Sequence, residues 1–418
     1  MNSRERVLTS MNYQQPDKVP IDFGSYHSSS IMAIAYAKLR DYLGLPKKPI
    51  RVYDIPQQLA IIDDDVLDRF NVDVIELGRG FNNDDADWKE WVLPDGTECL
   101  IPVWVDVEKD ADGNWVIHGP DRKTEIAIQK PGMVYFDQTY YPFAEDPAEK
   151  IDQLEELFAY NMWTAVVSPP GPHQWNEEGM RYLAEGAKKL RESTDRAIVG
   201  IYGGSIFEVG QMFFRNDNWY MALAAEPDLI HRWLDKLVSI HLKRINMFMD
   251  AVGPYIDVYL SSDDYGMQTG PQISPAMFRE FFKPRHKMMW DLVKSKKPDI
   301  KVKMHSCGSI NALLPDMIDA GLDAVNPVQT NCKLMEPERL KSQFKDQITF
   351  WGGGCNTQYV LPKGTPEEVR EDVFRNLDIF VPQGGYVFQQ IHNIQADVPP
   401  ENIVAMFDAV AEWNKLNM

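Results

Sequence analysis

Eight short runs of apolar and β-branched residues, each followed by a stretch with helical spacing, constrain most strongly how this chain can fold. They are Val19–Phe23, Val72–Leu77, Ala197–Tyr202, Asp257–Ser261, Lys301–His305, Ala324–Val328, Ile348–Trp351 and Tyr386–Gln390. Strands that alternate with helices form parallel sheets, because each crossover helix returns the chain to the end of the sheet where the previous strand began. Eight such units predict an α/β fold, the closed (β/α)₈ or TIM barrel, as a single domain over residues 1–418.

The helical stretches contain identifiable start signals. Residues 275–294 place apolar side chains at helical spacing after Ser274, a suitable N-cap, and Pro284 within them predicts a kink or a break. Residues 365–368, Thr-Pro-Glu-Glu, combine a capping residue, a first-turn proline and an acidic first turn. We therefore expect helices to begin at both places.

Residues 88–136 interrupt the alternation of strands and helices. Turn sequences at 94–96 and 110–113 separate strand-like runs such as Cys99–Val107 and Asn114–His118. This pattern predicts an antiparallel β-meander inserted after the second barrel strand. An insertion at that point lies on the face where barrel active sites form, so we expect it to wall or cap the pocket.

Composition excludes several classes of partner. Of 418 residues, 44% are apolar, and 62 acidic against 43 basic residues give a net charge of −19. An acidic chain without a basic block is a poor ligand for nucleic acid or an anionic membrane. The N-terminus has no apolar signal-peptide core, and no run of 18 apolar residues occurs, so we expect a cytoplasmic protein without a membrane span. Four cysteines are too few for a disulfide framework.

Polar and metal-binding side chains occur where the predicted strands end. They are His27, Tyr202, Asp263, Asp264, His305, Cys307, Gln329, Cys355, Gln390, His392 and Asn393. The C-terminal ends of barrel strands are the normal location of catalytic residues, so we expect these side chains to converge on one pocket. The residues expected to bind substrate are His27, Tyr202, Gln329, Gln390 and Asn393.

The pair His305 and Cys307 is the sharpest chemical signal. Side chains two residues apart on a strand point the same way, so an imidazole and a thiol would share one face. Nitrogen and sulfur ligands suit a tetrahedral Zn²⁺ site, and three protein ligands leave the fourth position open for substrate. The third ligand would be His392 or, alternatively, Cys355. The competing interpretation is that His305 caps the strand and Cys307 fills space.

The adjacent carboxylates Asp263 and Asp264 form a second signal. Neighbouring residues on a strand end point to opposite sides, so one would face the barrel mouth while the other caps a loop. The inward carboxylate would orient a ligand, bind the metal, or act as a general acid or base. We expect catalysis to involve Asp263, Asp264 and His305. Loop capping alone is the alternative for the two aspartates.

Several motifs together resemble those of a known enzyme group. They are Arg4–Leu8 and Pro16–Pro20 at the start, Asp263–Gly266, Ile273–Phe278 and His305–Gly308 in the centre, and Gly364–Val369 and Val398–Ile403 near the end. On these motifs the chain resembles the uroporphyrinogen decarboxylase superfamily, and within it the cobalamin-dependent methyltransferases. The resemblance is strongest over residues 190–412.

The resemblance implies zinc in the protein and a corrinoid cofactor held by a partner protein. In the thiol-methylating branch a cysteine after the last strand is the third zinc ligand, and the matching position here is His392. The decarboxylases hold the acidic porphyrinogen with an arginine-rich N-terminal motif. The matching residues 22–27 contain no arginine. The insertion at 88–136 resembles that of methyltransferases that act on methoxylated aromatic compounds.

The activity that the resemblance implies is transfer of a methyl group from a small methylated donor to the Co(I) of a corrinoid protein. A methoxylated aromatic compound, hence O-demethylation, is the expected donor. Two alternatives remain open: a methylcobalamin:thiol methyltransferase, and a cofactor-independent decarboxylase with Asp263 as the proton donor. A homodimer is a further expectation for the assembly.

Overall fold

A curled parallel sheet of seven strands forms the centre of the protein, in a computed structural model that describes residues 1–162 and 173–418. Its strand order is β15-β14-β13-β12-β11-β10-β3. The strands are β3 (Val74–Glu76), β10 (Ala197–Gly203), β11 (Val258–Ser262), β12 (Lys301–His305), β13 (Ala324–Asn326), β14 (Thr349–Trp351) and β15 (Tyr386–Val387). Seven of the eight predicted strands are thereby confirmed.

The first predicted strand, residues 19–23, lies between the two edges of this sheet. It makes one parallel bridge on each side, Ile21 with Phe388 and Asp22 with Val74, rather than a continuous strand. The Ile21 N–H donates to the Asp73 carboxylate at 3.0 Å, which takes it out of the ladder. The segment therefore joins the two edges without forming a full eighth strand.

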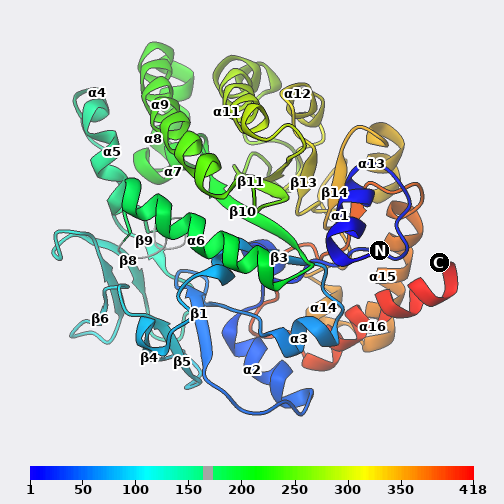
Figure 1. Ribbon diagram of the computed structural model, residues 1–418. Coiled ribbons are helices and arrows are strands. Elements are labelled where there is room, and N and C mark those ends of the chain that lie inside the picture. Colours follow the sequence, from blue (N-terminus) through cyan, green and yellow to red (C-terminus); the bar gives the residue numbers. More distant parts are fainter. Residues whose placement is uncertain (163–172) are drawn as a thin grey trace.

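Helices cover the outside of the sheet (Figure 1). They are α1 (Ser3–Met11), α2 (Ala33–Tyr42), α3 (Asp64–Arg69), α4 (Pro147–Lys150), α5 (Leu154–Leu157), α6 (Glu177–Ser193), α7 (Glu208–Phe214), α8 (Asn216–Ala225), α9 (Pro227–Val252), α10 (Pro275–Met277), α11 (Lys283–Lys296), α12 (Leu314–Asp319), α13 (Pro337–Phe344), α14 (Val360–Lys363), α15 (Pro366–Phe380) and α16 (Pro400–Asn417). No helix in the part of the chain described is long and apolar enough to cross a bilayer.

The expected helix starts are present. The Thr365 side chain accepts a hydrogen bond from the Glu368 N–H, and the Glu368 carboxylate accepts one from the Thr365 N–H, forming a capping box. The stretch 275–294 is interrupted as Pro284 predicted: a π-helical turn, Phe278–Phe282, separates α10 from α11. Proline lacks an N–H and disturbs the preceding turn, which accounts for the break.

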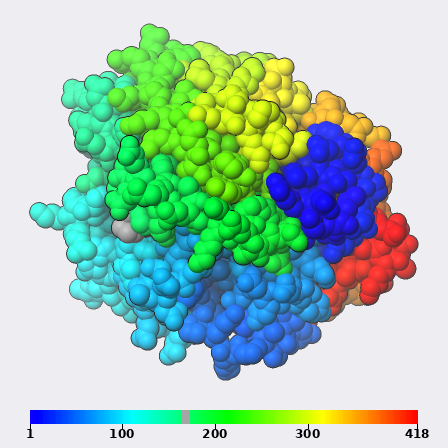
Figure 2. All heavy atoms as spheres, in the orientation of Figure 1, coloured from blue at the N-terminus to red at the C-terminus, as the bar shows by residue number. Residues whose placement is uncertain are grey.

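Alternation along the strands creates two hydrophobic layers. Val199, Ile201, Val258 and Leu260 point into the barrel-like interior, whereas intervening residues such as Tyr259 pack against the outer helices. Val7 and Met11 of α1 belong to the interior cluster. Helix α1 therefore closes the N-terminal end of the strands, beside β3, β10 and β15, and Figure 2 shows this segment in dark blue seated on that face. The candidate site lies at the opposite end of the sheet, where the strands have their C-termini.

The region predicted to be one meander is divided between two sheets. β4 (Trp88–Val92) and β5 (Glu98–Pro102) continue a sheet that starts with β1 (Ile50–Asp54) and β2 (Leu59–Ala60), in the order β2-β1-β5-β4. A separate antiparallel sheet contains β6 (Val107–Lys109), β7 (Trp115–His118), β8 (Glu125–Gln129) and β9 (Asp137–Gln138). The parallel pairing of β5 with β1, which lies far upstream, cannot be read from local turn signals. Figure 1 shows these strands at one side, away from α13–α16.

Candidate metal centre and acid cluster

The inward positions at the strand ends line a cavity of about 250 Å³, here called the mouth cavity. It is lined by Tyr26, His27, Ser28, Gln57, Ile201, Gly203, Ser205, Glu208, Met212, Ser262, Asp264, His305 and His392. Ser262 and His305 follow Leu260 and Lys303 by two residues, so they occupy the next inward layer of their strands. Every second side chain of a strand faces the interior, so these polar side chains also point toward the mouth of the barrel.

His305, Cys307 and His392 come together at this cavity. Their ligand atoms all lie within 4.8 Å of one another, and the Cys307 Sγ is 3.3 Å from the His305 Nε2. Tetrahedral zinc at about 2.0–2.3 Å from each ligand places neighbouring donors about 3.5 Å apart. The three side chains therefore form a candidate metal site. The alternative ligand Cys355 lies outside this group and is fully buried.

A buried amide sets the proton position on His305. The Asn326 side chain donates through Nδ2 to the Trp351 carbonyl at 2.9 Å and to Gln389 Oε1 at 2.8 Å. Its Oδ1 is therefore the acceptor for the His305 Nδ1–H at 2.8 Å. That arrangement leaves the lone pair of Nε2 free for a metal, the usual outer-shell support of a ligating histidine.

His392 is oriented in the same way, from the other side of the cavity. Its Nδ1 donates to Asn393 Oδ1 at 2.5 Å, and Gln395 Nε2 donates to the same oxygen at 2.9 Å. The Tyr135 hydroxyl donates in turn to Gln395 Oε1. A chain of hydrogen bonds thus joins Tyr135, which lies between β8 and β9, to the His392 imidazole.

The three candidate metal ligands are neutral in this environment. Burial and the nearby His305 lower the pKa of His392 to about 4, and burial also lowers the pKa of His305. Burial, followed by the charges of Asp264 and Glu208, raises the pKa of Cys307 well above its ordinary value. Neutral imidazoles are ready ligands, whereas the thiol must release its proton when a divalent cation binds.

Backbone geometry fixes Cys307. Its N–H donates to Asp264 Oδ1 at 2.7 Å, and the next residue, Gly308, has φ +81°. A Cβ on Gly308 would lie 2.4 Å from the Gly266 carbonyl carbon, so only glycine fits where these two loops meet. The loops after β11 and β12 therefore hold the thiol and the Asp264 carboxylate together.

Asp263 points away from the mouth cavity. Its oxygens accept hydrogen bonds from the N–H groups of Ile206, Phe207 and Glu208 at 2.7–3.0 Å and from the Tyr265 hydroxyl at 3.1 Å. The side chain is fully buried. These contacts cap the start of α7, so the geometry gives Asp263 a structural position rather than one among the residues around the cavity.

Asp264 and Glu208 are the carboxyl groups that line the cavity. Asp264 Oδ1 lies 3.5 Å from the His305 Nε2. Glu208 Oε2 accepts hydrogen bonds from Ser262 Oγ at 3.3 Å and Ser205 Oγ at 3.4 Å. Burial raises the pKa of Glu208 well above its ordinary value, and the charges of Asp264 and Asp263 raise it further. This environment therefore favours the protonated form of Glu208.

His27 lines the cavity as predicted and has an unpredicted partner. Its Nε2 lies 3.2 Å from Asp54 Oδ2, at the end of β1. Burial lowers the pKa of His27 to about 4 and raises the pKa of Asp54 to about 7. The neutral forms of both groups are thereby favoured in the wall of the cavity.

The other predicted substrate-binding residues do not line the cavity. The Tyr202 hydroxyl bonds to His241 Nδ1 at 2.9 Å, and Gln329 Oε1 accepts from the Gly308 N–H at 2.9 Å. Gln390 Nε2 donates to the Ser30 carbonyl at 3.4 Å, and Asn393 supports His392 as described. These side chains shape the loops around the cavity.

Sequence reasoning missed Glu208 and Asp54. Glu208 lies five residues beyond the end of β10, and the glycines that follow that strand could have indicated a loop at the mouth. Asp54 ends a strand outside the eight-strand pattern, so no strand-end argument covered it. Both depend on contacts between distant segments.

Comparisons of sequence and of fold with known proteins identify the family of this chain. Uroporphyrinogen decarboxylases of Chloroherpeton thalassium and Chlorobium phaeobacteroides are 29% and 27% identical over 77% and 45% of this chain, and over 92% and 50% of their own lengths. A solved structure of a methyltransferase from Methanosarcina mazei covers 99% of both chains with a TM-score of 0.58 and 17% identity, which establishes a shared fold. The family profile for uroporphyrinogen decarboxylase (URO-D) matches residues 136–413. The chain belongs to the uroporphyrinogen decarboxylase family.

Proposed function

We propose that this protein is a methyltransferase that moves a methyl group from a small methoxylated aromatic compound to the Co(I) of a corrinoid protein. The observation that carries the proposal is the convergence of His305, Cys307 and His392, two of which line the mouth cavity together with Glu208 and Asp264. The shared fold with a protein described as a methyltransferase supports the same branch of the family. The corrinoid protein is the second substrate and approaches the mouth of the barrel.

The donor set suits zinc. Two imidazole nitrogens and one sulfur are borderline-soft ligands, and each imidazole has an amide partner that leaves Nε2 available. A Zn²⁺ ion held there would supply a Lewis acid that takes up negative charge on the oxygen of the donor. Three protein ligands would leave one position open toward the cavity.

The residues of the chain contribute proton transfer and orientation. An aryl ether oxygen is a poor leaving group, because negative charge develops on it as the bond to the methyl carbon breaks. The methyl group passes to cobalt with the bonding pair supplied by Co(I), and the oxygen keeps the electrons of the broken bond. Glu208, whose protonated form burial favours, donates its proton to that oxygen. Asp264 holds the Cys307 loop, and His27 borders the bound ring.

Decarboxylation of a porphyrinogen is less consistent with this cavity. None of the described residues that line it is arginine or lysine, whereas Glu208 and Asp264 are both acidic. A substrate with several carboxylates would find no counter-charge among these residues, which opposes binding. The alternative function, methylation of a thiol, has less support here, because the third candidate metal ligand is His392 rather than a cysteine.

A spectroscopic assay with matched cysteine variants tests the proposal. The protein is incubated with a Co(I) corrinoid protein and a panel of methoxyarenes, methylamines and thiols, and formation of methyl-Co(III) is followed by absorbance. We expect methoxyarenes to react, Cys307→Ser to lose zinc and methyl transfer, and Cys355→Ser, a buried cysteine outside the cluster, to keep both. Equal activity and zinc content in the two variants would refute the site, and turnover without corrinoid would refute the reaction.

A further inference from the structure

A second cavity lies behind the wall of the mouth cavity and shares none of its lining residues. It has a volume of about 80 Å³ and is here called the aromatic cavity. Its walls include the rings of Phe23, Tyr53, Phe81, Trp88 and Trp104. A space of this size holds several water molecules or one small organic group, because a single water needs about 10–15 Å³ by this measure.

Tyr53 separates the two cavities. Its ring lines the aromatic cavity and stacks on the His27 ring, with centroids 5.8 Å apart and planes 12° apart. Trp88 is fixed by its Nε1–H, which donates to the Asn82 carbonyl at 2.8 Å, and the Arg51 guanidinium lies 5.2 Å from its ring centroid. The aromatic walls are therefore held in place, and one of them already attracts a cation.

One carboxyl group, Glu76, lines the aromatic cavity and has a single hydrogen-bond donor in the described part of the chain, the Gly78 N–H. Its Oε1 accepts from the Gly78 N–H at 3.1 Å, and no ion pair to Glu76 occurs among the described residues. Arg79 lines the same cavity, but its guanidinium donates to the Ile62 carbonyl and to Asp64, both at 2.5 Å. Burial raises the pKa of Glu76 to about 7. The nearby charge of Arg79 lowers the pKa of Glu76 somewhat, but this carboxyl group amid aromatic rings makes no direct ion pair with a described residue.

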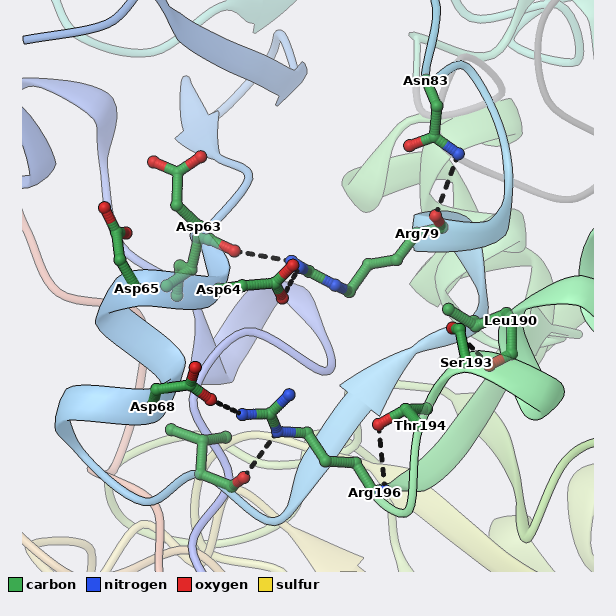
Figure 3. Close-up of polar contacts among 12 residues, drawn as sticks. Asp63, Asp64, Asp65, Asp68, Arg79, Asn83, Leu190, Ser193, Thr194 and Arg196 are labelled. Atoms are coloured by element: carbon green, nitrogen blue, oxygen red, sulfur yellow. Dashed lines mark hydrogen bonds and ion pairs between the residues drawn. The ribbon is translucent and has the colours of Figure 1, made fainter.

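The aromatic cavity opens onto a larger cleft of about 830 Å³, and Ile62, Arg79 and Phe81 line both. Figure 3 shows Asp63, Asp64 and Asp65 gathered at one side of this acidic cleft, with Arg79 extended toward Asp64 and Arg196 toward Asp68. The lining also includes Asp85, and each cation of the cleft is paired with an aspartate: Lys48, Arg51, Arg79 and Arg196. With five aspartates against four cations, the lining of this cleft has a slight excess of negative charge, which favours a cation over an anion.

We propose that the aromatic cavity binds a small organic cation of the quaternary ammonium class, with Glu76 as its counter-charge. Aromatic faces attract an alkylammonium group through their quadrupoles, and a nearby carboxylate completes the recognition of its charge. The cavity accommodates the methylated head, and a polar arm extends into the acidic cleft. This site is independent of the metal cluster and of the proposed methyl transfer.

Choline and dimethylbutanol, its neutral carbon isostere, test the proposal by calorimetry or NMR titration of the full-length protein. We expect saturable binding of choline. Its affinity should rise about tenfold from about pH 6 to about pH 8, because the ionised fraction of Glu76, with a pKa of about 7, rises about tenfold over that range. The isostere should bind at least tenfold more weakly and without dependence on pH. Equal affinity for both compounds, or no saturable binding of choline, would overturn the assignment.

Amino-acid substitutions test whether choline binds in the aromatic cavity. Glu76→Gln should weaken choline binding at least tenfold and remove its pH dependence, whereas Glu90→Gln, an exposed charge change on the same strand as Trp88, should change neither. Trp104→Leu keeps the carboxyl group and should also weaken binding, which guards against a folding defect in the first variant. His305→Ala should leave choline binding intact, and loss of binding there would assign the cation to the mouth cavity.

Discussion

The two adjacent aspartates should respond to substitution in opposite ways. Asp263 accepts three backbone N–H groups and the Tyr265 hydroxyl in a fully buried position, whereas Asp264 is partly exposed and accepts one N–H, that of Cys307. In Asp263→Asn, an amide nitrogen replaces one acceptor oxygen and faces backbone donors. We therefore expect that variant to lose stability and Asp264→Asn to lose activity.

The magnitude follows from the contacts. Loss of two hydrogen bonds to a charged group costs about 3–6 kcal/mol at roughly 1.5–3 kcal/mol each. For 418 residues an unfolding entropy of about 2.1 cal/mol/K per residue gives about 0.9 kcal/mol/K, so the Tm falls by about 3–7 °C. The single N–H contact of Asp264 sets an upper limit of about 2–3 °C by the same conversion, because the amide oxygen of asparagine can still accept it.

Differential scanning calorimetry together with metal analysis and the methyl-transfer assay distinguishes the two roles. Asp263→Asn should bind zinc and retain measurable turnover below its reduced Tm. Asp264→Asn should unfold near the temperature of the unsubstituted protein while turnover falls. The reasoning fails if Asp264→Asn is the less stable variant, or if Asp263→Asn abolishes turnover at an unchanged Tm.

Three further predictions concern the surroundings of the mouth cavity. Asn393→Ala should weaken zinc binding about 10–100-fold in a chelator competition, because His392 loses the acceptor for its Nδ1–H, while Asn311→Ala, at a partly exposed asparagine, leaves it unchanged. Because burial raises the pKa of Glu208 and favours its protonated form, kcat should fall as pH rises through that pKa. Glu208→Gln should lower kcat about 10²–10⁴-fold with zinc content unchanged, and an unaltered pH profile would contradict the assignment. Burial raises the pKa of Asp54 from 3.8 to about 7, so the folded state binds the extra proton: this contribution to stability is complete below about pH 4 and is lost as pH rises through about 7. In Asp54→Asn the Tm should depend less on pH between about 5 and 8, and a steeper dependence would show that another group dominates.

Local patterns predicted the elements of this fold better than their pairing. Seven barrel strands were found because alternation and β-branched residues are local signals, and the Thr365 cap is a local motif. The first strand is reduced to single bridges because a distant side chain, Asp73, takes one of its N–H groups. The inserted strands were found, but β5 pairs in parallel with β1, a contact across almost 50 residues that no turn sequence encodes.

The candidate site, too, was predictable from local patterns only in part. The spacing of His305 and Cys307 was sufficient to place both on one face, and the third strand-end candidate, His392, does lie beside them. Which of Asp263 and Asp264 faces the cavity depends on the turn before α7, whose N–H groups select Asp263. Glu208 acquires its role from burial among segments that meet only in the folded chain, and its raised pKa has no counterpart in the sequence.

The hydrogen-bond chain from Tyr135 to His392 has a mechanical consequence. Each amide in it is bound at both ends, so none can turn without losing a partner. A donor bulky enough to displace the segment between β8 and β9 would rotate the imidazole ring at the far end of the chain. His392 lines the mouth cavity, so the hydrogen-bond chain would couple the size of the bound donor to the orientation of a candidate metal ligand.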